Sequence, residues 1–193
     1  KDSETGEHIS RVSLYSRVIA KKLSERRNDL SPRIIREIYW FAPLHDIGKV
    51  GIPDKILLKP GKLNNEEYEH MKKHVVIGEK IIKEINSRIR NIIGYDSLSI
   101  ALDIISGHHE KHDGNGYPRG LKGEEIPIAG RIVALADVFD ALTTERPYKK
   151  PFSMEDSLKI IDKSNGTHFD PEVVQAFYDS LEKIKLIKQS YED

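Results

Sequence analysis

The chain reads Leu44-His45-Asp46-Ile47-Gly48-Lys49 at the end of an apolar pattern of helical period. An imidazole and a carboxylate on consecutive positions can offer two ligands to one metal centre, and ions held in this way activate water against phosphorus. A His-Asp dipeptide is also common as a cap or as a surface pair, so it identifies no site by itself. The sequence around it has to decide between these interpretations.

Apolar residues recur with helical spacing on both sides of the His45-Asp46 pair. One helix is predicted to begin at Ser31-Pro32, an N-cap followed by proline, and to be kinked by Pro43 in its last turn. Helical patterns also cover 4–19, about 97–111 and about 129–143, and capping signals predict helices after Asn64 and after Asp170. A glycine- and proline-rich segment, 113–127, predicts an ordered loop. No strand alternation is visible, so the predicted fold class is all-α.

Composition limits the kinds of ligand. The 193 residues suit a single domain, 1–193, and the balance of 31 Lys and Arg against 31 Asp and Glu favours neither a nucleic acid polymer nor an acidic membrane surface. Without cysteine, metal ligands must be His, Asp or Glu, which suits iron or manganese at least as well as zinc. No apolar run reaches membrane-spanning length. We expect a cytoplasmic domain, cut from a longer protein that carries an N-terminal sensory or receiver domain and could be membrane-tethered.

Histidines extend the apolar faces of four predicted helices, where polar side chains are uncommon. They are His8, His45, His74 and His109; the face of the third also carries Met71, Gly78, Ile81 and Ile85. One histidine in such a position is usually a core residue with a backbone partner. Four buried imidazoles all need partners, and a shared metal cluster satisfies them together. Glu4 lies one turn before His8 and could reach the same site.

Other polar residues could join this cluster. Asp137 and Asp140 lie three residues apart on one helix face, and the two oxygens of Asp137 could bridge two ions. His108 and His109 would project about 100° apart on a helix, so we expect them to serve different ions. Three histidines are predicted to lie outside the site: His70, His112 and His168.

Read in order, these motifs resemble the HD-GYP family of HD-superfamily phosphohydrolases. The resemblance extends from Glu4 to Phe177 and runs through 44–54, 59–63, 71–74, 107–111, 113–118, 137–142 and 146–149. Gly116-Tyr117-Pro118 supplies the second signature of the family. His112 departs from the pattern, because many members carry tryptophan before the Asp-Gly of this loop.

The resemblance implies an HD-domain helical bundle with the Gly/Pro-rich loop over a metal site that holds two or three divalent ions, iron or manganese. The implied ligands are His45, Asp46, His74, His108, His109 and Asp137. Glu4 and His8 match the additional ligands of members that hold three metals. The implied reaction is hydrolysis of cyclic di-GMP to linear pGpG, GMP or both, through a metal-bridged hydroxide.

The resemblance and the residue chemistry also suggest roles around the ligands. Asp46 and Lys49 are the candidate catalytic residues; Lys49 would contact the phosphate or protonate the leaving oxygen, or else stabilise Asp46 as a surface lysine. The candidate substrate-binding residues are Tyr117, Arg146, Lys149 and Asp140. For Tyr117 the alternatives are stacking on a guanine or hydrogen bonding near one, and simple loop packing.

Two other functions compete with this hypothesis. The first keeps the HD fold and changes the substrate to another cyclic dinucleotide or a nucleotide. The second is a signalling module that senses cyclic di-GMP or docks on a partner without turnover. Partner hypotheses are cyclic di-GMP, a homodimer through an N-terminal helix, and partner signalling domains. The sequence contains all the metal ligands that the resemblance implies and the Gly116-Tyr117-Pro118 run, and both features favour catalysis.

Overall fold

The structure, a computed structural model, describes residues 6–145 and 150–191. Its α-helices are α1 (Gly6–Leu23), α2 (Pro32–Phe41), α3 (Asp54–Leu57), α4 (Asn65–Ile93), α5 (Ser99–Gly107), α6 (Ile128–Thr143), α7 (Met154–Lys163), α8 (Pro171–Tyr178) and α9 (Leu181–Gln189). Short 3-10 helices are η1 (Ala42–Leu44), η2 (Ile47–Gly51) and η3 (Gly123–Glu125). The described residues contain no strand, only an isolated bridge between Asn165 and Phe169. The predicted all-α fold is confirmed.

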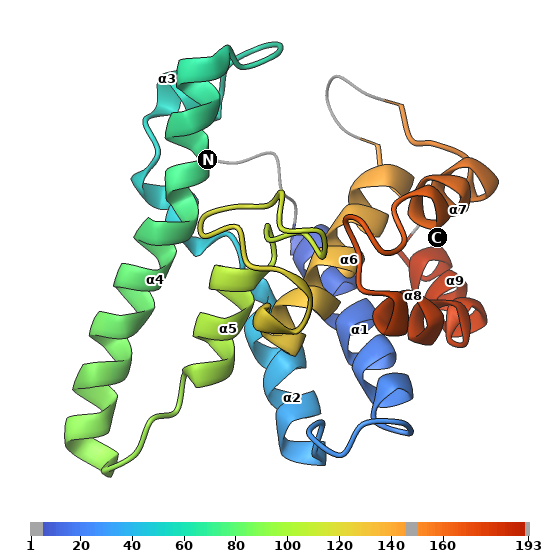
Figure 1. Ribbon diagram of the computed structural model, residues 1–193. Helices are drawn as coiled ribbons and strands as arrows, with labels where there is room; N and C mark the ends of the chain where they lie inside the picture. The colour runs from blue at the N-terminus through green and yellow to red at the C-terminus, as the bar shows by residue number, and fades with distance from the viewer. Residues whose placement is uncertain (1–5, 146–149, 192–193) are drawn as a thin grey trace.

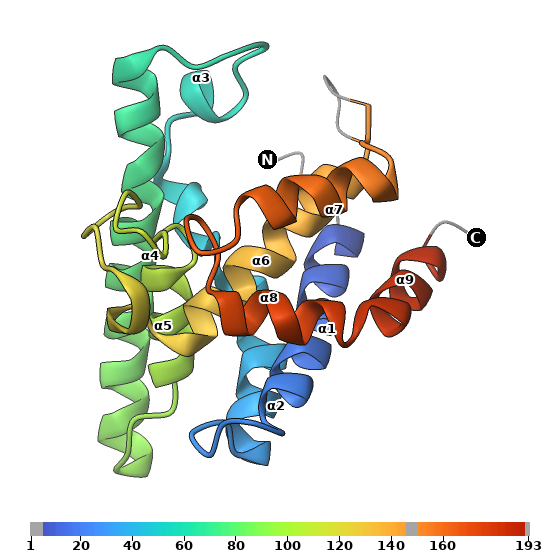
Figure 2. The same ribbon diagram turned by 45° about the vertical axis from the view of Figure 1, so that its right-hand side comes forward.

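The helices pack around α1, which contacts α2, α6, α8 and α9 (Figures 1 and 2). The main core lies among these helices, and aromatic rings fill its centre. The ring of Tyr15 meets Phe139 edge to face at 5.3 Å between centroids, and Phe139 meets Phe177 at 5.1 Å. All three side chains are fully buried. Full burial of aromatic side chains supplies a large share of the hydrophobic stabilisation.

A second, smaller core lies between α4 and α5. Its buried members are Val75, Ile82, Ala101 and Ile105. The α4 helix begins at the predicted cap, because the Asn64 side chain accepts from the Glu67 N–H and Glu67 accepts from the Asn64 N–H. The expected apolar face of α4 is correct at His74 and Gly78 but wrong at Ile85, which is 41 % exposed. The buried face turns instead through Ile82.

Three helix boundaries differ from the predictions. Instead of continuing with a kink, α2 ends at Phe41, and a 3-10 turn that contains Pro43 follows it. Helix α5 ends at Gly107 and not near 111. The final predicted helix is two helices, α8 and α9, which are separated at Asp179 and Ser180, and α7 was not predicted.

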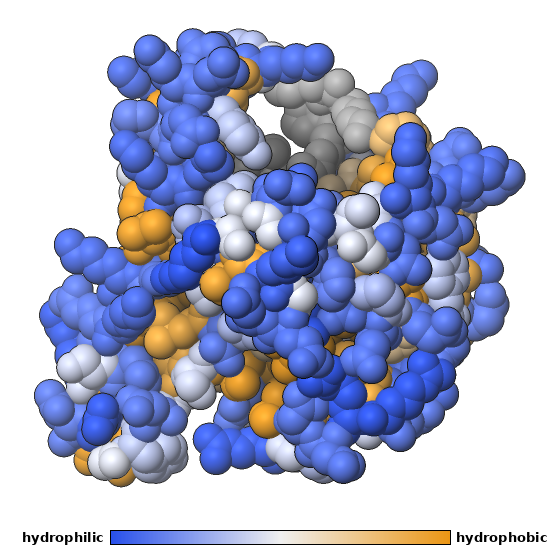
Figure 3. Space-filling model, viewed as in Figure 1, coloured by the Kyte–Doolittle hydropathy of each residue, from blue (hydrophilic) through white to orange (hydrophobic). Residues whose placement is uncertain are grey.

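The surface is largely hydrophilic on the face drawn in Figure 3, where apolar side chains show in small separate patches. The same view shows a hollow at the upper end, bordered on one side by the N-terminal half of α4. Among the described residues, no helix combines the length and the apolar character needed to cross a bilayer. The ligand candidates come from elements on both sides of the boundary between the two cores.

Candidate metal centre

The His45-Asp46 pair lies in the junction between two 3-10 turns. His45 is the C-cap of η1, and Asp46 is the N-cap of η2. The break of α2 before Pro43 therefore turns the chain so that both side chains enter the interior. His45 is 1 % exposed, and its Nδ1 lies 2.7 Å from the carbonyl oxygen of Ala42.

Gly48 allows this junction to lie directly against α4. A Cβ atom on Gly48 would stand 1.8 Å from the carbonyl oxygen of His74 and 2.5 Å from the backbone nitrogen of Gly78. Any side chain at this position would therefore push η2 away from α4. The glycine of the His-Asp-x-Gly pattern thus brings Asp46 and His74 to the same site.

Three buried histidines are oriented in the same way. The Nδ1 atoms of His45, His74 and His108 each lie 2.7–3.1 Å from a backbone carbonyl oxygen. A proton on Nδ1 that is donated to a carbonyl leaves Nε2 as the lone-pair atom, and this tautomer is the usual one for a histidine ligand. The main chain therefore fixes which nitrogen of each ring faces the site.

The first ligand group contains Asp46, His74, His108 and His109, whose candidate ligand atoms all lie within 4.8 Å of one another. The Oδ1 atom of Asp46 is 3.0 Å from His74 Nε2 and 3.7 Å from His108 Nε2. The described residues provide no hydrogen-bond partner for His108 Nε2, although it is buried. A buried imidazole nitrogen without such a partner is what an ion would satisfy.

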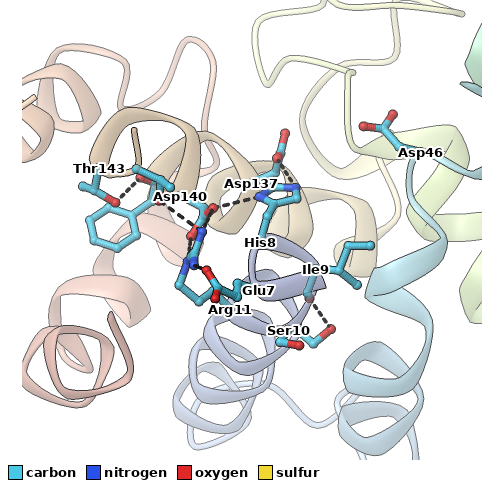
Figure 4. Close-up of polar contacts among 12 residues, drawn as sticks. Glu7, His8, Ile9, Ser10, Arg11, Asp46, Asp137, Asp140 and Thr143 are labelled. Carbon is cyan, nitrogen blue, oxygen red and sulfur yellow. Dashed lines mark hydrogen bonds and ion pairs between the residues drawn. The ribbon is translucent and has the colours of Figure 1, made fainter. Parts of the chain in front are cut away.

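The second ligand group contains His8, His45 and Asp137. His8 Nε2 lies 3.6 Å from Asp137 Oδ1, and His45 Nε2 lies 4.0 Å from the same oxygen. Figure 4 shows His8 of α1 between two carboxylates of α6, Asp137 and Asp140. The predicted alignment of these aspartates on one helix face is confirmed.

Asp140 is buried behind His8. Its carboxylate is 1 % exposed, with Oδ2 lying 2.8 Å from His8 Nδ1 and Oδ1 accepting from Arg11 Nε at 2.6 Å (Figure 4). These contacts favour a supporting role behind His8 over the predicted role of Asp140 in substrate binding. Burial alone would raise the pKa of Asp140, but hydrogen bonds from His8 and Arg11 hold it below its ordinary value. A carboxylate behind a histidine ligand fixes its tautomer and its orientation.

Asp46 lies between the two groups. Its Oδ1 faces His74 and His108, and its Oδ2 is 3.4 Å from His45 Nε2. Burial would raise its pKa, but the surrounding imidazoles of His45, His108 and His74 hold the pKa well below the ordinary value. The carboxylate therefore remains ionised and offers one oxygen to each side, as a bridging ligand requires.

His108 and His109 fall in the same ligand group, contrary to the expectation of separate ions. The expectation assumed helical spacing, but α5 ends at Gly107 and His109 lies in the following turn. The two rings are 4.0 Å apart with an interplanar angle of 42°. Burial lowers the pKa of both histidines, so both are neutral and ready to act as ligands near pH 7.

The Gly/Pro-rich loop folds over this group and is held from inside by Glu110. The buried Glu110 carboxylate accepts from the backbone N–H groups of Arg119 and Leu121, at 2.7 and 3.0 Å. Gly116 makes the close return possible, because a Cβ there would lie 2.3 Å from the backbone nitrogen of Lys111. The loop therefore has a defined path above His109.

A second contact fastens the same loop to α4. The Arg119 guanidinium lies 2.7 Å from the carboxylate of Glu79, which is 5 % exposed. Tyr117 then covers the site: its N–H donates to the His109 carbonyl, and its ring stacks on the His109 ring at 4.7 Å. Burial raises the pKa of Tyr117 above its ordinary value, so the phenol stays protonated.

Sequence reasoning missed the supporting residues Arg11, Glu79, Glu110 and Arg119. Arg11 carried a usable signal, because it lies one turn after His8 on the same helix. Glu110 follows the two histidines directly but reads as an ordinary polar residue. Glu79 and Arg119 are 40 positions apart in the sequence, and no local pattern predicts a contact between them.

Lys49 and the remaining candidates differ in position. The Lys49 ammonium lies 2.8 Å from Asp46 Oδ2, and its side chain is 21 % exposed. Glu4, Arg146 and Lys149 lie outside the described residues. Neither ligand group found among the described residues includes His70, His112 or His168.

The residues present fit a divalent metal centre of more than one ion. Five imidazoles and two carboxylates converge, partners on Nδ1 fix the tautomers of four of the histidines, and an ionised aspartate connects the two groups. Asp46 Oδ1 and His74 Nε2 are buried atoms for which the described part of the chain supplies no hydrogen bond of proper geometry. Nitrogen and oxygen donors of this kind suit first-row divalent ions.

Comparison with known proteins agrees with this arrangement. A family model described as an HD domain matches residues 3–173. The chain belongs to the HD domain family. The match covers both ligand groups, the loop and most of the helices, and the resemblance to HD-GYP proteins is confirmed.

Two relatives and one solved structure are similar to this HD domain. A cyclic di-GMP phosphodiesterase of Thermotoga maritima is 48 % identical over 95 % of the chain and 46 % of the relative. The 3′3′-cGAMP-specific phosphodiesterase 2 of Vibrio cholerae is 40 % identical over 100 % of the chain and 34 % of the relative. The crystal structure of a cyclic GMP-AMP-specific phosphodiesterase of V. cholerae has a TM-score of 0.66 at 20 % identity, and covers 91 % of this chain and 44 % of that one. The chain spans less than half of each of these proteins.

Proposed function

We propose that this HD domain is a metal-dependent phosphodiesterase that hydrolyses cyclic di-GMP to linear pGpG, GMP or both. The observation that carries the proposal is the pair of ligand groups that meet at Asp46. A relative of 48 % identity is named for cyclic di-GMP, which narrows the substrate class.

The chain's own residues would hold two divalent ions, one in each group. Bound ions of this kind neutralise charge on a phosphodiester and lower the pKa of a water molecule toward neutrality. The ligand set contains His and Asp but no sulfur, so we infer iron or manganese as the native metal. Glu4 would add a ligand beside His8, which favours a third ion in the second group.

The residues around the ligands would bind and orient the substrate. The Lys49 ammonium lies 2.8 Å from Asp46 Oδ2, where it would contact the phosphate or donate a proton to the leaving 3′ oxygen. Arg146 and Lys149 are proposed to bind the second phosphate. The Tyr117 ring, stacked on His109, excludes water from one side of the first ligand group.

A second candidate substrate is 3′3′-cGAMP, because a relative of 40 % identity is named for it. The two cyclic dinucleotides share the phosphodiester ring and differ in one base, so the ligand groups do not distinguish them. A sensor without turnover is less well supported, because the two ligand groups contain all six ligands that the family resemblance implies, and His8 as well.

The test is turnover of a substrate panel by protein that was purified anaerobically and loaded with iron or manganese. We expect hydrolysis of cyclic di-GMP, with pGpG or GMP resolved by chromatography, and slower or equal hydrolysis of 3′3′-cGAMP. Cleavage of mononucleotide substrates alone would contradict the proposal. Binding of cyclic di-GMP with no product from the fully loaded protein would favour the sensor.

A further inference from the structure

Three side chains form a cluster beside the first ligand group, and the proposed mechanism uses only one of them, Tyr117. Tyr68 and Lys72 lie four residues apart on one face of α4, and Tyr117 comes from the loop. The two tyrosine rings meet edge to face at 6.5 Å between centroids. The Lys72 Nζ atom lies 5.6 Å from the Tyr68 ring centroid and 5.7 Å from that of Tyr117, within the range of a cation–π contact.

The cluster leads from the ligand group to the solvent. The ring of Tyr117 is stacked on His109 and lies 6.5 Å from the ring of His74, so it touches the metal ligands. Tyr68 is the outer member, and it is 48 % exposed. It lies in the N-terminal half of α4.

The chemistry of the cluster suits a flat, anionic ligand. An open tyrosine face stacks on any nucleobase, and this stacking contributes without base-specific hydrogen bonds. The Lys72 ammonium adds positive charge beside the ring, although it also lies 2.6 Å from Glu69. If Tyr68 only anchored the loop, the loop would bury it, whereas about half of its surface is open.

We propose that Tyr68 and Lys72, together with Tyr117, form a nucleobase subsite that stacks one purine of a cyclic dinucleotide while its phosphodiester lies at Asp46. This inference rests on the proposed function, since it assigns a place to one base of the proposed substrate. It also predicts that the subsite does not select between guanine and adenine.

The test compares Tyr68→Ala with Tyr68→Phe in the metal-loaded protein, and Lys73→Ala is the matched control because Lys73 is an exposed neighbour on another face of α4. For Tyr68→Ala we expect the KM for cyclic di-GMP to rise about tenfold, and kcat to change by less than about twofold. Tyr68→Phe keeps the ring and should behave like the unaltered protein. Lys72→Met should also raise KM, by a smaller factor.

A binding measurement separates this inference from the proposed function. The probe is the bis-phosphorothioate analogue of cyclic di-GMP, titrated by calorimetry into the same proteins, and 3′3′-cGAMP is used for a second set of KM values. We expect Tyr68→Ala to raise the Kd of the analogue, and to raise the KM values for cyclic di-GMP and 3′3′-cGAMP by the same factor. An unchanged Kd and KM in Tyr68→Ala, with normal turnover by the unaltered protein, would overturn the subsite alone. Absence of turnover by the unaltered protein would overturn the proposed function. In that case the ratio of the Kd of Tyr68→Ala to the Kd of the unaltered protein would still test the subsite.

Discussion

The two ligand groups of this HD domain are held in place by different means. In the group of Asp46, His74, His108 and His109, backbone carbonyls fix two of the rings and a glycine contact sets the distance between elements. In the group of His8, His45 and Asp137, His8 depends on a side-chain ion pair, Asp140 with Arg11. Main-chain contacts survive most substitutions, whereas a side-chain contact is removed by one. The second group should therefore be separable from the first.

The largest effect should follow Gly48→Ala, which attacks the main-chain support of the first group. The new Cβ would meet backbone atoms of α4 at 1.8 and 2.5 Å, and neither can move without displacing His74. We expect the free energy of unfolding to fall by about 3 kcal/mol, with loss of metal from both groups. Urea denaturation and metal analysis measure this.

Gly6→Ala is the matched control, because a Cβ at Gly6 meets nothing within 4 Å. It should leave both stability and metal content unchanged. Equal stability of the Gly48 and Gly6 variants would contradict the tight contact between η2 and α4.

Asp140→Asn should produce the next largest effect and should separate the groups. The amide keeps the size of the side chain but removes the charge that His8 and Arg11 share. Loss of such a partner typically lowers metal affinity about 10- to 100-fold, so we expect weaker binding of one ion and retention of the other. Metal titration measures both, and Glu182→Gln, an exposed site paired with Lys185, is the control. Equal weakening of all bound metal would show that the groups are not independent.

Arg119→Gln tests the loop that covers the first group, and its effect should be smaller. The change breaks the contact with Glu79, while Glu110 still holds the loop backbone. The pair is partly exposed, so a loss of about 1 kcal/mol is expected, seen as a KM for cyclic di-GMP about fivefold higher. Arg88→Gln, which breaks an exposed pair with Glu84, should have no effect. A fall in metal content without a change in KM would assign Arg119 to the metal site instead.

The smallest effect concerns the pH dependence of stability in metal-free protein. Burial lowers the pKa of His108 and His109 in the folded state below the ordinary value of 6.5. Below pH 6.5 the unfolded chain then binds more protons than the folded chain, so the free energy of unfolding rises as the pH rises through that window. This contribution to stability is lost as the pH falls through the folded pKa values. Urea denaturation from about pH 5 to about pH 7 should show this rise. His109→Gln should flatten it, and an unchanged slope would contradict burial of a neutral imidazole.

The sequence predicted the parts of this fold that depend on local chemistry. The capping pair Asn64 and Glu67 and the shared face of Asp137 and Asp140 are present as expected, because each involves neighbours along one helix. The predicted helix that contains His108 and His109 extends beyond the observed end of α5 at Gly107, because apolar periodicity does not reveal where tertiary contacts stop a helix. The contact of Asp140 with Arg11 could not be predicted, because the two residues are 129 positions apart and only the folded chain brings them together.

The candidate ligands could be assembled from the sequence only through their position at the ends of apolar faces and their resemblance to a family. Their division into two groups could not be predicted from the sequence, because it depends on Asp46 pointing one oxygen to His74 and the other to His45. The orientation of each ring likewise depends on backbone carbonyls such as that of Ala42, which a sequence does not locate in space.

The most direct test of the central claim, that Asp46 joins two metal groups, is the metal content of Asp46→Ala purified anaerobically beside the unaltered protein. We predict at least two ions per chain in the unaltered protein. Asp46→Ala should lose metal from both groups and should not hydrolyse cyclic di-GMP, while circular dichroism shows the same helical content. A variant that keeps its full metal content and its activity would contradict the claim.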